Sequence, residues 1–152
     1  MKTYQSFGAL ARALTRSIEE MPATFLEVAE TGAELVQEAA KAKIGHYQEA
    51  AGPFPKWAEL KDATKADRVR QGFSENDPLL RTGELRDSIK SEATPAGFIV
   101  GSASPIAEYQ ELGTAHIPPR PFLGSSLIES APAIVTALGS AVELTIAGSK
   151  QP

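Results

Sequence analysis

Glu108, Glu111 and His116 have the spacing that comes closest to a catalytic or metal-binding pattern in this chain. The two carboxylates lie three residues apart, which places them on one face of a helix, and the histidine follows shortly after. Metal ligands on helices also need partners that orient them, and this segment offers none. His46 lies beside Tyr47 on an expected helix and is interpreted as a structural histidine. We therefore expect no metal site and no cofactor.

Other catalytic chemistry is equally poorly supported. The chain has no cysteine, which excludes zinc-ribbon, iron–sulfur and thiol-nucleophile sites. The serine segments "GSAS" and "GSS" lack the glycine pattern of a serine nucleophile elbow. A phosphate-binding glycine loop and a dinucleotide fingerprint are both missing. The residues thus predict a protein that is not an enzyme.

The first third of the chain, 1–48, is predicted to be helical. An apolar stripe at Phe7, Leu10, Leu14 and Ile18 ends at Pro22, which should interrupt it. Thr24 and Glu27 form a capping-box pattern, so a second and longer helix is expected over roughly 24–48. Gly32 inside that helix suggests a close approach of another backbone or side chain.

A long loop is expected over 50–78, with a short helix after Thr64, where Thr64 and Asp67 form another box pattern. It carries two large aromatic residues, Phe54 and Trp57. One interpretation is that the tryptophan plugs the domain's own core. The other is that the loop orders only against a neighbouring subunit, with Trp57 or Phe54 as the anchor.

The segment 79–124 contains the clearest local signals. Thr82 can cap a short helix, and alternating residues predict a β-hairpin over 88–94 and 97–102. Ser104, Pro105 and Gly113 bound a helix of about two turns over 105–112. The prolines that follow should hold an extended Pro/Arg strand, in which Phe122 and Leu123 return to the core.

The segment 125–148 is predicted to be the C-terminal helix, opened by a capping box at Ser126 and Glu129. Pro132 means that this helix either begins near Ser130 or bends. Residues 131–148 are apolar, but Pro132, Gly139 and Glu143 interrupt them, so a packed helix is favoured over a membrane span.

Together these elements predict one α+β domain over residues 1–152. The N-terminal helices, including one long helix, would pack on a small antiparallel sheet of about three or four strands, with a short helix and a C-terminal helix. The alternative is an all-helical bundle in which "GFIVGS" is a buried helix. Gly97, Gly101 and the β-branched residues between them argue against it.

The charge distribution points away from nucleic-acid binding. The formal net charge is −4, whereas a nucleic-acid binder needs a basic surface. The last third is poor in charge, and such a segment tends to be buried in a core or against a partner. Its charged residues are Glu108, Glu111, Arg120, Glu129, Glu143 and Lys150.

Glu111 poses an electrostatic problem. It falls in the last turn of the expected short helix, where the helix dipole disfavours a carboxylate. Arg120, or free backbone amides beyond Gly113, could offset this cost. We predict that Arg120 is held by an acidic partner in its own chain or in a neighbour, with the surrounding prolines fixing its approach.

The ordered segments "LLRTGELRDSI", "IVGSASPIAEYQELGT" and "PPRPFLG" resemble the bacteriophage tail-completion, or head–tail joining, family of virion-morphogenesis proteins. The resemblance covers roughly 55–124. Many relatives carry a tyrosine where this chain has Ile106, and Tyr109 is the aromatic residue that can substitute. The elements that carry the resemblance are Trp57 with Leu60, Leu80 with Gly83, Leu85 and Ser88, Val100 with Gly101, Glu111 with Gly113 and Thr114, and Arg120 with Pro121 and Phe122.

This resemblance implies a structural virion protein at the neck of a tailed phage or phage-like particle. Made in the host cytoplasm, it would complete the tail and join it to the head connector, as part of a ring of copies, six to match the tail. Its neighbours would be the connector and the tail-terminator or tail-tube proteins. DNA would pass without specific binding, and no membrane would be involved.

The alternative is a small peptide- or protein-binding adaptor. The candidate assembly residues are Phe54, Trp57, Tyr109, Glu111, Arg120 and Phe122.

Overall fold

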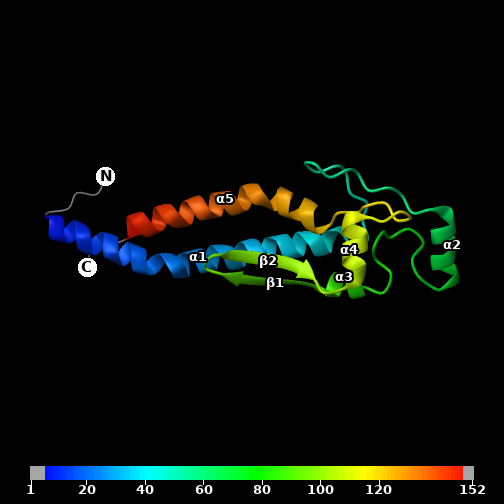
Figure 1. Cartoon of the computed structure of the whole chain (residues 1–152), viewed down its shortest axis with the longest axis horizontal. Helices are drawn as coiled ribbons and strands as arrows, with labels where there is room; N and C mark the ends of the chain where they lie inside the picture. The colour runs from blue at the N-terminus through cyan, green and yellow to red at the C-terminus, as the bar shows by residue number, and fades with distance from the viewer. Residues whose placement is uncertain (1–5, 149–152) are drawn as a thin grey trace.

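The computed structural model describes residues 6–148, with side-chain surroundings given to residue 145. The elements in chain order are α1 (Phe7–Lys43), α2 (Asp62–Arg70), α3 (Glu84–Asp87), β1 (Ile89–Thr94), β2 (Gly97–Ser102), α4 (Pro105–Leu112) and α5 (Leu123–Gly148). The molecule is elongated: α1 runs along it, α5 lies beside α1, and the hairpin follows the C-terminal half of α1 (Figure 1). The predicted α+β class is confirmed.

The N-terminal part is one helix, so the predicted break at Pro22 is wrong. Thr24 lies inside this helix, and its hydroxyl donates to the carbonyl of Glu20 at 3.3 Å instead of capping a new helix. Proline removes one backbone donor, but packing on both sides of it keeps the helix together. Ser17, before the proline, and Ala29, after it, are both buried. α1 also ends earlier than predicted, at Lys43.

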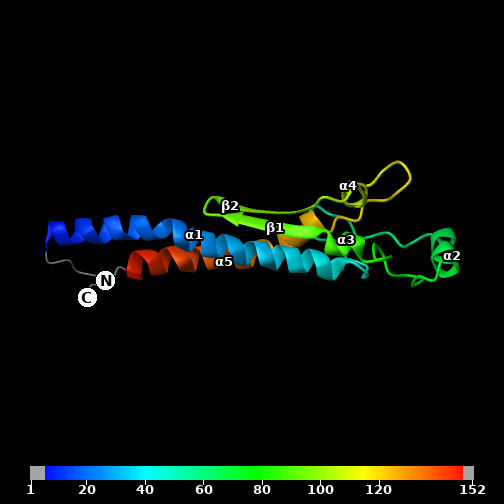
Figure 2. The same ribbon diagram turned by 90° about the horizontal axis from the view of Figure 1, so that it is seen from below.

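α5 runs antiparallel to α1, as two perpendicular views show (Figures 1 and 2). Near one end, the hydroxyl of Ser17 donates to the carbonyl of Thr145 at 3.3 Å. Near the other end, the buried ammonium of Lys43 donates to the Glu129 carboxylate at 2.8 Å. Polar contacts therefore fix the register of the two helices at both ends.

α5 begins earlier than predicted. The hydroxyl of Ser126 donates to the carbonyl of Phe122 at 2.7 Å, as a serine inside a helix does, so Ser126 is not a cap. The helix then continues through Pro132. No strand forms at Phe122 and Leu123, because Leu123 is already the first residue of α5.

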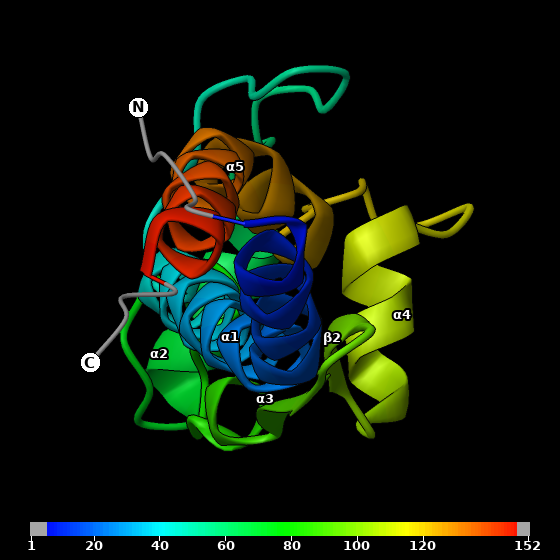
Figure 3. The ribbon, with the colours of Figure 1, turned by 90° about the vertical axis from the view of Figure 1, so that its left-hand side faces the viewer.

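The hairpin has the predicted position, with Ile89 opposite Ser102 and Thr94 opposite Gly97. Within residues 6–148 the sheet has two strands, so the expected three or four is wrong. It packs against α1 (Figure 3). The predicted close approach at Gly32 is confirmed: a Cβ there would lie 2.9 Å from Cε1 of Phe98 on β2 and 3.5 Å from Cγ1 of Ile134 on α5.

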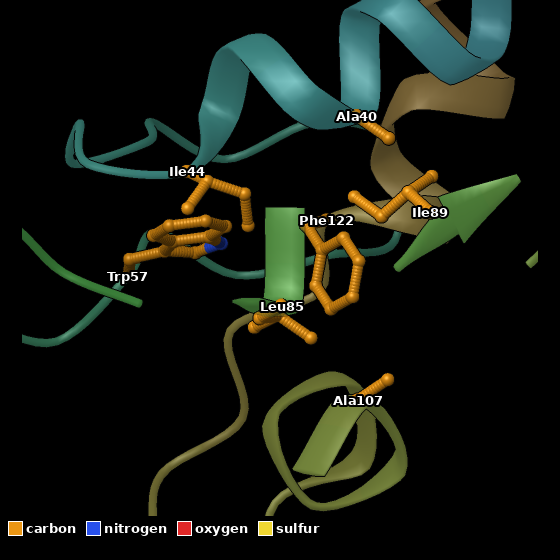
Figure 4. Packing of buried hydrophobic residues seen from close by; sticks show 7 residues of the cluster. All are labelled: Ala40, Ile44, Trp57, Leu85, Ile89, Ala107 and Phe122. Carbon is orange, nitrogen blue, oxygen red and sulfur yellow. The ribbon is translucent and has the colours of Figure 1, made fainter. Parts of the chain in front are cut away.

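The core lies where the C-terminal end of α1 meets the segments around the hairpin (Figure 4). Trp57 is only 2% exposed, so the loop that carries it is attached to the domain's own core. The loop is also interrupted by α2, which begins at Asp62, before Thr64, and has no side-chain cap. The buried cluster consists of Ala40, Ile44, Trp57, Leu85, Ile89, Ala107 and Phe122.

We predict opposite effects of one substitution at two helical glycines. Gly32→Val should lower the free energy of unfolding by about 1–3 kcal/mol, because its branched side chain would collide with Phe98. Gly139→Val should leave stability unchanged or slightly higher, because nothing lies within 4 Å of a Cβ there. Urea unfolding of both variants tests this, and equal losses would contradict the close packing at Gly32.

Candidate assembly site

The structure brings five of the six candidate residues to one place, the turn between α4 and α5. We call residues 111–124 the α4–α5 junction. Glu111, Arg120 and Phe122 belong to it, and Phe54 and Trp57 reach it from the loop that follows α1. Tyr109 is the exception, because its side chain is 52% exposed on α4.

The carboxylate of Glu111 holds the junction together. Its Oε2 accepts from the amides of Phe122 at 2.8 Å and Leu123 at 2.9 Å, and its Oε1 accepts from the amide of Gly124 at 2.7 Å. The first amides of a helix have no partner inside it and carry the positive end of its dipole. The C-terminal turn of α4 therefore supplies the anion that caps α5. Of the two partners proposed for Glu111, backbone amides are the ones found.

Gly113 makes the reversal after α4 possible. Its φ of 75° is in the region that favours glycine, and its amide donates to the carbonyl of Tyr109 at 3.0 Å. A Cβ at this position would lie 2.8 Å from the backbone nitrogen of Pro119 and 2.9 Å from the carbonyl oxygen of Ile117. Both close atoms are backbone atoms, so the turn cannot easily make room for a side chain.

Arg120 attaches the loop that carries Trp57 to the junction. Its guanidinium donates through Nε to Ala58 O at 3.2 Å, and through Nη2 to Ala58 O at 2.8 Å and Glu59 O at 3.4 Å. Burial lowers the pKa of Arg120 from its ordinary value, although a guanidinium remains charged at neutral pH. The predicted acidic partner is thus not found within the described chain, where carbonyl oxygens take its place. A partner from a neighbour stays a prediction.

The aromatic candidates divide by exposure. Phe122 is fully buried and Trp57 nearly so. Phe54 is half-buried against the start of α5, where a Cβ on Gly124 would lie 2.5 Å from its Cζ. These three side chains pack inside the subunit. Tyr109 instead shares the outside of α4 with Ile106, 52% exposed, and Leu112, 71% exposed.

The outer stripe of Ile106, Tyr109 and Leu112 follows a three-residue spacing, and this spacing is the signal in the sequence by which the surface can be found. α5 exposes more large apolar side chains than α4 does. By length and composition its segment 123–145 is apolar enough to cross a membrane, although in the structure it lies along α1. Its exposed large apolar residues are Leu127, Ile128, Val135, Leu138 and Leu144.

No group of three or more histidine, aspartate or glutamate side chains within the described residues could hold a metal ion. Glu111, which sequence spacing had linked to His116, is instead engaged by backbone amides. His116 itself is exposed, with its amide bonded to the hydroxyl of Thr114 at 3.2 Å. The geometry of the junction serves to hold segments together.

The family model described as the phage virion morphogenesis family matches residues 6–140. The chain belongs to this family. The match extends from α1 through most of α5, so it includes the junction and the hairpin. No curated protein and no solved structure matches the chain significantly. Family membership supports a structural role in phage virion assembly and association with the virion.

The carboxylate of Glu111 gives a direct prediction. Glu111→Gln should lower the free energy of unfolding by about 2 kcal/mol or more, because hydrogen bonds to a charged group are strong and the new amide nitrogen would face backbone donors. Glu30→Gln, at an exposed position of α1, is the control and should change stability by less than about 0.5 kcal/mol. Similar losses in urea unfolding of the two variants would contradict the capping role.

A second pair of variants isolates the close packing at Gly113. Gly72 also has positive φ, 79°, but nothing lies within 4 Å of a Cβ there. Gly72→Ala should therefore cost about 1 kcal/mol from backbone strain alone. Gly113→Ala should cost at least about 2 kcal/mol more, because its Cβ would also collide with backbone atoms. Thermal unfolding of both proteins measures the difference, and equal costs would disprove this explanation.

Proposed function

We propose that this protein is a structural component of the neck of a tailed phage or phage-like particle, where it completes the tail and joins it to the head connector. The observation that carries this proposal is the family match over residues 6–140. The segments that resemble tail-completion proteins also supply the α4–α5 junction, including Glu111, Gly113 and Arg120. In this role the chain is a non-catalytic scaffold.

We further propose that copies of the chain assemble into a ring, six to match the tail, through the exposed apolar side chains of α5. Exposed apolar surface of this extent is unfavourable in water and marks interaction sites. On α5 it includes Val135, 68% exposed, and Leu144, 70% exposed. The ring would leave the outer surface of α4, with Tyr109 and Leu112, for contacts with the connector and tail proteins.

The charge pattern fits a channel that DNA passes without being held. Exposed carboxylates follow α1, and the phosphate backbone is repelled by such a surface. They belong to Glu19, Glu20, Glu27, Glu30, Glu34 and Glu38. Within 123–145, in contrast, the charged residues are only Glu129 and Glu143. We propose that the acidic face of α1 lies toward the channel and that α5 lies against neighbouring copies and not against lipid.

Substitution of the exposed α5 residues tests the ring. Val135, Leu138 and Leu144 together changed to serine should reduce infectious particles at least about tenfold, because the copies would lose their apolar contact. The stability of the isolated subunit should change by less than about 1.5 kcal/mol, because the three side chains are exposed. Val69→Ser, at a 56% exposed position of α2, is the control and should leave particle yield unchanged.

Two measurements complete this test. Electron microscopy of purified particles should locate the wild-type protein as a ring at the neck. A particle without it there would favour the adaptor alternative. Flotation of the wild-type protein with lipid vesicles, together with normal particle assembly by the triple variant, would contradict α5 as the contact between copies.

A further inference from the structure

A cavity of about 460 Å³ lies between α2, α4 and the turn that follows α4. Besides His116, its walls carry four cationic side chains, Lys61, Arg68, Arg81 and Arg120, and one acidic side chain, Glu84. The chain as a whole has a net charge of −4, so this cavity is a basic site on an acidic protein. Its volume is in the range of sites that bind small ligands or short chain segments.

Two of the four cations are buried without a carboxylate. Arg68 and Arg120 are each only 5% exposed. Arg68 donates to the carbonyls of Ser74, at 2.7 Å, and Leu80, and Arg120 donates to those of Ala58 and Glu59. No ion pair of the described residues includes either guanidinium. Buried charges are normally paired, so each of these two cations still lacks its counter-ion.

The other basic residues differ from this pair. Arg81 is already engaged by Asp67 and Gln71 and lies 4.9 Å from the ring of Phe73. Lys61 lies at the exposed rim. Arg68 and Arg120 are therefore the two cations of the cavity that lack a counter-ion among the described residues. Both guanidinium groups retain Nη1 donors that make no hydrogen bond to the described chain, and a carboxylate can accept from such donors.

Gln110 adds an independent observation. It lines the same cavity, and its Oε1 is the buried side-chain atom among the described residues that has no hydrogen-bond partner. An acceptor left in this state is costly, and it gains a partner when the side chain turns to meet a donor in the cavity. A peptide supplies an N–H donor close to a carboxylate. A phosphodiester supplies only acceptors.

The cavity also has apolar walls, formed by side chains such as Leu60, Leu79, Ile106 and Ile117. Such walls suit an acidic residue flanked by apolar ones and do not suit a hydrated phosphate backbone. We propose that this cavity binds an acidic, extended segment of another polypeptide, with the carboxylate on Arg68 and Arg120 and a backbone N–H on Gln110. That this segment belongs to a neighbouring virion protein rests on the proposed function.

A pair of capped tripeptides tests the site in the isolated full-length protein. One carries glutamate between two leucines, and the other carries glutamine in its place. The Nε–H signals of Arg68 and Arg120 report binding by NMR, since both groups already donate to carbonyls. The glutamate peptide should shift both signals in a saturable way, and the glutamine peptide should bind at least about tenfold more weakly.

A variant of Gln110 separates binding from folding. Gln110→Met removes the acceptor at similar size, so the melting temperature should stay equal or rise, while the affinity for the glutamate peptide falls about fivefold. Gln37→Met, on α1 outside the cavity, should change neither quantity. A Gln110→Met protein that melts lower but binds equally well would assign Gln110 a structural role and contradict its part in binding.

Three results would overturn the proposal. One is that neither peptide shifts the arginine signals, and another is that both shift them equally. The third is that inorganic phosphate or a thymidine oligonucleotide shifts them more strongly than the glutamate peptide, which would identify a general anion or nucleic-acid site. None of these results bears on whether a ring is found at the neck, so the two proposals can fail separately.

Discussion

The contact between the Glu111 carboxylate and the first amides of α5 is the interaction on which the rest of the structure depends. A carboxylate is disfavoured at the C-terminal end of α4, and the first amides of α5 have no partner inside their own helix. The hydrogen bonds between them stabilise the charge of Glu111 and satisfy these amides at the same time. It also sets where α5 begins. The start of α5 in turn places Phe122 in the core and aligns α5 along α1, where Lys43 meets Glu129.

The subunit divides into a well-packed end and a thinly covered end. The core cluster, the junction and the hairpin gather around the C-terminal end of α1, whereas the described residues at the other end belong to α1 and α5 (Figure 1). When two helices pack together, each covers only one side of the other, so apolar residues on the remaining sides stay in contact with water. Phe7, Ile18 and Leu144 therefore remain exposed there. A virion protein that is completed by its neighbours would have this distribution of packing.

The structure separates two surfaces of opposite charge. Carboxylates line the exposed side of α1, where a passing anion would be repelled. The cavity beside the junction includes two buried guanidinium groups, those of Arg68 and Arg120, whose hydrogen-bond partners among the described residues are carbonyl oxygens. The arginine that secures the Trp57 loop from inside thus also presents charge to the cavity. In the proposed binding role, the same side chain meets a structural and a binding demand.

The sequence by itself determined the elements whose signals are local. Alternation with a Pro95–Gly97 turn predicts the hairpin, and Ser104, Pro105 and Gly113 bound α4 closely, because strand pairing across a tight turn and helix ends depend on adjacent residues. Tertiary structure decided the rest. Pro22 does not end α1 because packing on α5 offsets the lost hydrogen bond, and Ser126 is no cap because Glu111 caps the helix from another element. The partners of Arg120 lie about 60 residues away in the chain, and no local rule reaches across that separation.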